Sequence, residues 1–485
     1  MTSATPRREA IWTFADDILF QAQMRPEQPA IVLAGRLATY SMIARGIAGV
    51  EARLRSLGFQ PGELVAVALA SPVSQIIVVA ALFRLGVASV SVERGERLRA
   101  AGLAARACLQ DPGGALVPGV TPILVDKSWF EGSAPAAGAA GGFTDNEALC
   151  RVELSSGSTG RPKAIASTVG DFERRLGAQR VVETFGVRGR VLIALQLSSG
   201  WGFRVAVGVL AGGGTLIFAA TTAEVTPLAA AAQAEAIVTS PIQARDLLRD
   251  SKPGTLGGLS LRALLIGGGL ATRALVTEVR SRLCANTIVQ YGATESGPIT
   301  ITPADLLMET EGATGRPLPG VTIEIVDNED RPVRGGAAGN VRVRTAAMGR
   351  IFSPRDDGAD AQLRDGWFYP GDIGRLREDG MLVLEGRASE VINSGGVKHA
   401  PERIEEVVLR HPNVADAGAF GAFGPDGIEE INVAVVVRAP ISEALLIDWC
   451  REHGVHVARA FTVDSLPRTP LGKIRRGELK DSLVG

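Results

Sequence analysis

The sequence is poor in cysteine, has no excess of either charge and has no long uninterrupted apolar run. Its 485 residues include four cysteines far apart, with no CxxC or metal-binding spacing: Cys108, Cys150, Cys284 and Cys450. This predicts reduced thiols in a cytoplasmic protein. Lysine and arginine number 51 against 52 aspartates and glutamates, which gives no electrostatic reason to expect a nucleic-acid or anionic-membrane partner.

No targeting signal or membrane span is expected either. The opening MTSATPRREAIWTFADDILF carries charges where a signal peptide has an apolar core. The most apolar stretch, residues 191–220, is interrupted by Arg204, two serines and three consecutive glycines. That pattern favours a buried sheet-and-helix region over a membrane span.

A Walker phosphate loop is also missing, although a related chemistry is present. Residues 154–165, LSSGSTGRPKAI, combine hydroxyl donors, two glycines and Lys163, which together suit a phosphate chain. Gly160 is followed by Arg-Pro-Lys-Ala rather than by Lys and Ser or Thr, so the Walker pattern is excluded. The alternative reading is a flexible surface turn.

The chain is too long for one hydrophobic core, so at least two domains are expected. Residues 41–57 have the apolar spacing of a helix that ends before Gly58, and 63–69 reads as a strand. Further βα units of this kind predict a doubly wound α/β domain with buried parallel strands. The Ala/Gly-rich segment 131–149 is interpreted as a flexible connection.

The pattern changes after about residue 312. Short strands with Gly and Asp turns predict an antiparallel or barrel-like section. Beyond Gly386, a helix begun by Pro401, a strand and a second helix predict a small α+β domain. The predicted domains are residues 1–386 and a mobile 387–485, with a hinge near 387–390.

Two further segments offer groups for a nucleotide. Residues 290–300, QYGATESGPIT, follow a predicted strand and present an aromatic ring at Tyr291, a hydroxyl at Thr294 and an oxygen ligand for Mg²⁺ at Glu295. In DGWFYPGDIGRL, residues 365–376, Asp372 in a predicted tight turn suits ribose hydroxyls. The alternatives are a solvated or helix-capping acid and a plain hairpin turn.

The last two segments lie near the C-terminus. They are LEGRASEVINSGGVKHAPERIEE, residues 384–406, and LPRTPLGKIRRGELK, residues 466–480. Two prolines and a glycine in the second predict a turn that presents Lys473. A solvated basic helix start is the alternative there.

Read in order, these five segments resemble the adenylate-forming superfamily, which includes acyl- and aryl-CoA synthetases, luciferases and the adenylation domains of peptide synthetases. SSGSTGRPK resembles the family's phosphate loop, YGATES its central motif, GWFYPGD and GR…INSGGVKHAPERIEE the segments flanking its hinge, and PRTPLGK its C-terminal lysine motif. Residues 37–67 resemble its N-terminal region, so the resemblance spans nearly the whole chain.

The resemblance implies roles for these residues. Glu295 holds Mg²⁺, Thr294 contacts the α-phosphate, and Lys473 bridges the substrate carboxylate and the α-phosphate. Tyr291 lies against adenine beside Gly292, and Asp372 binds the ribose with Arg387 nearby. The β- and γ-phosphates are gripped by the loop Ser155, Ser156, Gly157, Ser158, Thr159, Gly160 and Lys163, and the passage beside adenine and acyl group is formed by Gly267, Gly268 and Gly269.

Amino-acid-activating relatives have an aspartate where this chain has Leu197, which disfavours an α-amino acid. The expected pocket wall is Leu197, Ser198, Ser199, Trp201 and Phe203, with Gly268 and Gly297, and it predicts an aromatic or short to medium aliphatic acid. Core packing is the alternative for Trp201. Gly395 and Gly396 are expected to line the thiol channel. Ser389 departs from the Asp or Lys usual at the hinge, and Pro370 stands where Thr is frequent.

The predicted function is therefore an ATP-dependent carboxylic acid–CoA ligase that uses ATP, Mg²⁺ and coenzyme A and proceeds through an acyl-adenylate. One alternative is a stand-alone ligase that loads the pantetheine of a carrier protein. Others are a non-catalytic relative that binds acyl-adenylate and a luciferase-like oxygenase. The implied partners are small molecules, with a carrier protein and a homodimer left open.

Overall fold

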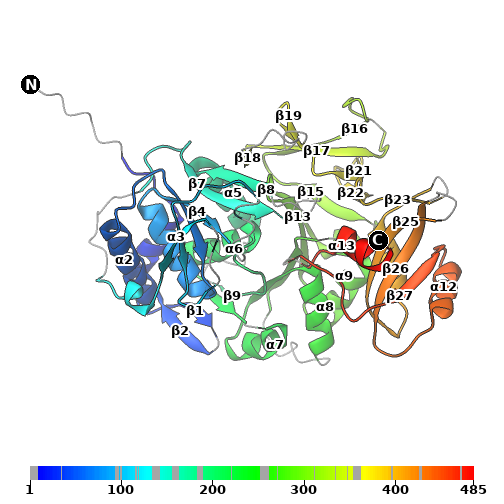
Figure 1. The fold of residues 1–485 in the computed structure, drawn as a ribbon, viewed down its shortest axis with the longest axis horizontal. Coiled ribbons are helices and arrows are strands. Elements are labelled where there is room, and N and C mark those ends of the chain that lie inside the picture. The colour runs from blue at the N-terminus through cyan, green and yellow to red at the C-terminus, as the bar shows by residue number, and fades with distance from the viewer. Residues whose placement is uncertain are drawn as a thin grey trace, which may run out of the picture.

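The computed structural model describes residues 9–33, 35–92, 98, 101–114, 117, 119–133, 142–155, 163–182, 189–219, 221–251, 261–269, 271–310, 312–333, 335–346, 348–352, 362–394, 397–424, 429–469 and 472–484. A large domain carries a smaller one at its C-terminal end (Figure 1). The predicted α/β class and the small α+β domain are both confirmed.

Parallel strands form the centre of the larger sheet. Their order is β13 (Thr287–Ala293), β12 (Ala263–Gly267), β11 (Ala236–Thr239), β9 (Arg190–Ile193), β10 (Thr215–Phe218) and β1 (Pro29–Leu33), with β2 (Arg36–Thr39) antiparallel at the edge. Helices α7 (Thr222–Ala231), α8 (Pro241–Asp250) and α9 (Arg273–Arg282) contribute to the core on one face. The carboxyl ends of β12 and β13 carry Gly267 and Tyr291, so both lie at one edge of the sheet.

The apolar segment 191–220 folds as predicted, as strand β9, helix α6 (Gly200–Ala211) and strand β10. No helix in the described part of the chain is long and apolar enough to cross a bilayer.

The second sheet has the order β18 (Arg350–Phe352), β8 (Lys163–Thr168), β7 (Leu149–Ser155), β4 (Ala88–Ser91), β3 (Leu64–Ala68), β5 (Ala107–Gln110) and β6 (Thr121–Leu124). A 3₁₀ turn, η1 (Lys127–Phe130), follows β6. Between the two sheets lie α1 (Phe14–Met24), α2 (Tyr40–Ser56), α3 (Pro72–Arg84), α5 (Val169–Val182) and α6. The helix predicted over 41–57 is α2, and the Thr39 hydroxyl caps it by accepting from the Met42 amide.

A buried ion pair joins the second sheet to α6. Arg204 on α6 donates to Glu153 on β7 at 2.8 Å, and their side chains are 3% and 2% exposed. Gly200 begins α6 so close to Glu153 that an added Cβ would lie 2.2 Å from its carboxyl carbon. The strand that leads into the phosphate loop is therefore fixed to the helix that carries Trp201.

An antiparallel section continues the larger sheet, as predicted, but it begins at residue 297 rather than near residue 312. It runs from β14 (Gly297–Pro303) through β15 (Ala313–Pro317), β22 (Leu382–Arg387), β21 (Asp372–Leu376) and β17 (Gly339–Thr345) to β20 (Trp367–Phe368) and β19 (Leu363–Arg364), with β16 (Val321–Val326) paired to β17 and α10 (Ala304–Met308) after β14. Two expectations need correction. Tyr291 lies within β13 rather than beyond it, and Asp372 begins β21 instead of occupying a turn. In both cases pairing with a neighbouring strand extends the local structure.

The small domain has its own apolar core. Its elements are β23 (Ile392–Ser394), β24 (Val397–His399), α11 (Pro401–Leu409), β25 (Val414–Phe423), β26 (Glu429–Val437), α12 (Glu443–Glu452), β27 (Arg459–Thr462) and α13 (Arg476–Val484). The predicted helix starting at Pro401 and the strand near 431–438 correspond to α11 and β26.

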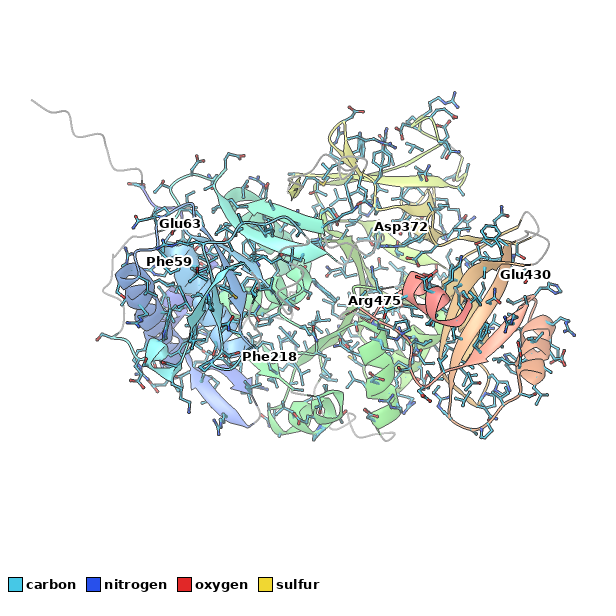
Figure 2. All side chains as sticks on the ribbon, in the orientation of Figure 1. Phe59, Glu63, Phe218, Asp372, Glu430 and Arg475 are labelled. Atoms are coloured by element: carbon cyan, nitrogen blue, oxygen red, sulfur yellow. The ribbon has the colours of Figure 1, made fainter. Side chains whose placement is uncertain are left out.

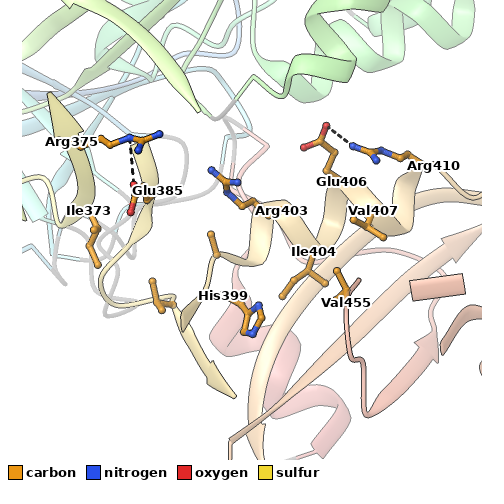
Figure 3. A pocket seen from close by; sticks show the side chains of 12 residues that line it. Ile373, Arg375, Glu385, His399, Arg403, Ile404, Glu406, Val407, Arg410 and Val455 are labelled. Carbon is orange, nitrogen blue, oxygen red and sulfur yellow. Dashed lines mark hydrogen bonds and ion pairs between the residues drawn. The ribbon is translucent and has the colours of Figure 1, made fainter. Parts of the chain in front are cut away.

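A cavity of about 560 Å³ lies where the small domain meets the β21–β22 hairpin. Figure 3 shows Arg375 and Glu385 of the hairpin on one side and Arg403 and Glu406 of α11 on the other. Its lining contains none of the predicted site residues, so it is separate from the site built below.

Candidate active site

The predicted phosphate loop is flanked by two paired strands. Strands β7 and β8 are antiparallel, with Ser155 opposite Lys163. The predicted loop residues Ser156, Gly157, Ser158, Thr159 and Gly160 lie outside the described residues, as do Gly395 and Gly396 of the predicted thiol channel. The Lys163 ammonium donates to Gln362 Oε1 at 2.6 Å, which fixes one cation at the mouth of this loop.

Glu295 lies in the tight connection between β13 and β14, where it is 8% exposed. Buried Arg175 of α5 holds this turn by donating to the carbonyls of Thr294 (2.9 Å) and Glu295 (2.5 Å). The Gly349 amide also donates to the Glu295 carbonyl at 2.7 Å. These bonds fix the backbone of the turn, and the Glu295 carboxylate also has a hydrogen bond with its own backbone.

The charges around Glu295 come from three parts of the chain. Burial raises the pKa of the Glu295 carboxyl. The positive charges of Lys163, Arg175 and Lys473 oppose that shift. An acid surrounded in this way can take up a divalent cation, because Mg²⁺ is bound through one or two carboxylates together with substrate phosphates. No group of three metal-ligating side chains occurs among the described residues.

Tyr291, Asp372 and Arg387 form a connected set. The Tyr291 hydroxyl donates to Asp372 Oδ2 at 2.5 Å, and Arg387 Nε lies 3.3 Å from Asp372 Oδ1. Strand pairing of β21 with β22 places Asp372 opposite Arg387. Burial raises the pKa of Asp372, and the Arg387 charge opposes that shift. Figure 2 shows Asp372 on the side of the antiparallel section that faces the small domain.

Lys473 extends from the small domain toward the same groups. Its ammonium interacts electrostatically with Arg387, Asp372 and Glu295, and the surrounding protein together with the Arg387 charge lowers its pKa. Lys473 nevertheless keeps exposed surface, so a substrate can reach it. Lys163 and Lys473 therefore lie within electrostatic range of Glu295, and Lys473 also lies within that range of Asp372.

The predicted acid pocket is brought together only in part. Trp201 is half-buried, and its ring edge lies so close to Gly267 that an added Cβ there would lie 2.7 Å from Trp201 Cη2. Gly268 has a φ of +78°, and Gly297 a φ of +71° beside the Arg175 side chain. The carbonyl of Gly297 would lie 2.5 Å from a Cβ on Gly292, which keeps this hairpin tight.

Some predicted pocket residues have structural tasks. Ser199 caps α6 by accepting from the Gly202 amide at 3.1 Å, and Leu197 is buried in the core. Phe203 does not line a pocket: it is fully buried against Phe14 and Phe172 and under the Arg151 guanidinium. Trp201 and Phe203 are two positions apart on α6, which is about half a helical turn, so their side chains face opposite sides of the helix.

The predicted hinge residue Ser389 is exposed in the turn that follows β22. The amides of Glu390 and Val391 both donate to the Arg387 carbonyl. This short hydrogen-bonded turn is the covalent link from the β21–β22 hairpin to the small domain.

Comparison with known proteins agrees with this geometry. A family profile described as AMP-binding enzyme matches residues 19–352, and the AMP-binding enzyme C-terminal domain matches residues 403–473. The chain belongs to the AMP-binding enzyme family. It is thus a member of the adenylate-forming superfamily and an AMP-forming acid–thiol ligase.

Among its relatives in this family is the 2-succinylbenzoate–CoA ligase of Bacillus subtilis, 26% identical over 96% of this chain and 98% of that protein. A salicylyl-CoA synthase/salicylate adenylyltransferase of a Streptomyces species is 32% identical over 68% of this chain and 62% of its own length. The solved structure of the o-succinylbenzoate CoA synthetase from Bacillus subtilis with its acyl-adenylate superimposes with a TM-score of 0.83 at 25% identity, covering 96% of this chain and 98% of that one. The same enzyme with ATP and a magnesium ion also gives 0.83.

Arg175 is the site residue of this family member that the sequence analysis missed. It follows Phe172 by three positions and precedes Leu176, and all three are buried. An arginine between apolar residues at helical spacing was the available signal, since a buried guanidinium needs partners. Which partners it has depends on the contact between α5 and the β13–β14 turn, and no local pattern shows that contact.

Proposed function

We propose that this family member joins an aromatic or medium-length aliphatic carboxylic acid to CoA through an acyl-adenylate. The observation that carries the proposal is that Lys163 and Lys473, from separate segments, lie within electrostatic range of the buried Glu295 carboxylate. Position 197 is a leucine rather than the aspartate of amino-acid-activating relatives, which argues against an α-amino acid as the substrate. The named substrates of the relatives, 2-succinylbenzoate and salicylate, support an aromatic acid.

Binding of ATP is assigned to three groups of residues, of which the first is held in place by its own contacts. Asp372, supported by Tyr291 and Arg387, would accept hydrogen bonds from the ribose hydroxyls, and its buried carboxylate has two partners that fix its orientation. The loop from Ser155 to Lys163 would hold the β- and γ-phosphates. Gly267, Gly268 and Gly269 would leave room beside the adenine and the acyl group, because none of them has a side chain.

The first reaction brings two anions together, and this chain supplies the opposing charge. The carboxylate oxygen of the acid attacks the α-phosphorus of ATP, and pyrophosphate leaves. Lys473 would bridge carboxylate and α-phosphate, Lys163 would lie at the departing phosphates, and Thr294 would contact the α-phosphate. Mg²⁺, held by Glu295, would add positive charge at the phosphates when bound. No general base is needed, because a carboxylic acid is already ionised near neutral pH.

In the second reaction the thiol of CoA attacks the acyl carbon, its proton is lost and AMP leaves. For this step we propose that the small domain, residues 387–485, turns about the segment 387–390 that contains Ser389. Lys473 then leaves the site, and Gly395 and Gly396 form the passage for pantetheine. Such hinge motion is a known mode of switching.

A panel of acids tests the proposal directly. Purified protein is given ATP, Mg²⁺ and one acid at a time, with acid-dependent exchange of labelled pyrophosphate into ATP as the readout. CoA or a pantetheinylated carrier protein is then added and the thioester is identified by mass. We expect exchange with aryl or C4–C10 acids and a CoA thioester as product. Pyrophosphate exchange with amino acids alone would refute the proposed class of acid. Acylation of the carrier protein but not of CoA would refute CoA as the acceptor.

Replacement of Lys473 separates the two reactions. Lys473→Ala should lower adenylate formation by about 10²–10³-fold, by analogy with loss of one transition-state donor, while thioester formation from preformed acyl-AMP is largely spared. Lys480→Ala, on the surface of α13, is the matched control. Equal losses in both reactions would contradict the proposed departure of Lys473. The predicted homodimer can be tested by light scattering. The predicted cytoplasmic location can be tested by cell fractionation.

A further inference from the structure

One acidic side chain connects the two domains close to Lys473. Asp416, near the start of β25, accepts from Arg468 Nη2 through both oxygens, at 2.8 and 2.6 Å. Arg245 on helix α8 of the large domain donates to the same carboxylate, with Nη1 at 2.8 Å from Oδ1. Asp416 and Arg468 are about one-fifth exposed and Arg245 one-third. The ion pair is therefore partly shielded from water and spans the domain boundary.

Arg468 transmits this connection to the lysine turn. Arg468 Nη1 donates to the carbonyl of Gly472 at 2.5 Å. Gly472 directly precedes Lys473. The Lys473 amide donates to the Thr469 hydroxyl at 3.1 Å, and the Thr469 amide to the Lys473 carbonyl at 2.8 Å. A change in the position of Asp416 would thus reach the backbone of Lys473 through one arginine.

The same turn lies directly on α8. A Cβ on Gly472 would be 2.0 Å from Ile242 Cγ2, and the φ of Gly472 is +82°. Ile242 and Arg245 are three residues apart and so share one face of α8. Figure 1 shows α8 beside the strands of the small domain. One face of a single helix therefore makes both the apolar and the ionic contact with the segment that presents Lys473.

We infer that Arg245 is a positioning residue for the adenylation step: through Asp416 and Arg468 it holds the turn that carries Lys473 in the site. This inference rests on the proposed role of Lys473. Arg245 pairs with Asp416 and is not among the residues assigned to substrate or nucleotide, so its effect is confined to the arrangement in which the turn is seated on α8. The reaction with CoA, for which Lys473 is not needed, is independent of this ion pair.

The test compares Arg245→Ala with Arg249→Ala. Arg249 lies one turn further along α8, and its ion pairs are with Asp246 and Asp250 of the same helix. We expect Arg245→Ala to lower acid-dependent pyrophosphate exchange roughly three- to tenfold, the range of a partly exposed ion pair at an interface. The rate of thioester formation from preformed acyl-AMP should stay within about twofold of the wild-type rate, the effect of a weak surface ion pair. Arg245→Lys should restore part of the exchange rate, and Arg249→Ala should resemble the wild type.

A second readout does not depend on catalysis. Hydrogen exchange at the amides of Thr469, Gly472 and Lys473, each hydrogen-bonded within the turn, should be faster in Arg245→Ala than in the wild type or Arg249→Ala. Arg245→Gln, which keeps a polar side chain, replaces Arg245→Ala if the latter fails to fold. Equal loss in both half-reactions, or unchanged amide exchange in a folded variant, would overturn the inference. Absence of any pyrophosphate exchange in the wild type would instead overturn the proposed function and leave the amide comparison to decide the positioning of the turn.

Discussion

Arg175 gives the sharpest test of how the structure prepares Glu295. In Arg175→Met the apolar stem is kept and the hydrogen bonds of the guanidinium are lost, including those to the carbonyls of Thr294 and Glu295 and to the Ser167 hydroxyl. The Glu295 carbonyl retains the Gly349 amide as a donor, whereas the Thr294 carbonyl loses the guanidinium that holds it. One carbonyl left without its donor costs about 1–3 kcal/mol, and removing a buried charge returns part of that cost.

We therefore expect the free energy of unfolding of Arg175→Met to fall by only about 1–2 kcal/mol. The effect on catalysis should be larger, because a displacement of about 1 Å in a catalytic group can cost 10²-fold in rate. Pyrophosphate exchange should fall by about that factor, and the Mg²⁺ concentration needed for half-maximal exchange should rise. Urea unfolding and exchange assays over a range of Mg²⁺ concentrations measure the two effects separately.

Arg174→Met is the matched control, since Arg174 is half-exposed on the same helix and pairs with Asp171. Arg174→Met should change neither the free energy of unfolding nor the rate and Mg²⁺ requirement of pyrophosphate exchange by much. The reasoning is wrong if folded Arg175→Met exchanges pyrophosphate at the wild-type rate with an unaltered Mg²⁺ requirement, or if both variants lose activity equally.

Two further predictions concern Gly267 and Glu295. In Gly267→Ala the new methyl meets the Trp201 ring, so the KM for aromatic acids should rise about tenfold, as for overpacking by 1–3 kcal/mol. The KM for ATP should rise less, because the methyl is directed at Trp201, although Gly267 also borders the proposed adenine passage. Gly177→Ala, where the methyl meets nothing within 4 Å, is the control. Because the pKa of Glu295 is raised in the folded protein, its contribution to stability is present at acid pH and is lost as the pH rises through that raised value. Glu295→Gln should therefore raise the melting temperature of the nucleotide-free protein at neutral pH, and this gain should vanish below about pH 4. A gain that is independent of pH, or one shared by the exposed Glu478→Gln, would contradict this.

Local patterns were sufficient for most of the secondary structure. The apolar spacing of 41–57, with Thr39 before it and Gly58 after it, predicts α2, and the interruptions within 191–220 predict a strand, a helix and a strand. These features depend on neighbours within four residues along the chain. The expectations for Tyr291, Asp372 and Phe203 were less accurate, because strand pairing extends β13 and β21 and because α6 turns Phe203 into the core between the sheets.

The sequence by itself determined the family, the order of the five segments and the residue types that meet a nucleotide, since each motif is a short contiguous run. Only the tertiary structure decided which groups act on one another. Lys163, Glu295 and Lys473 meet because the second sheet, the β13–β14 turn and the small domain pack around one space. Arg175 and Arg245 received their roles in the same way, because an arginine's partner is chosen by the surface opposite it, and that surface is distant in the chain.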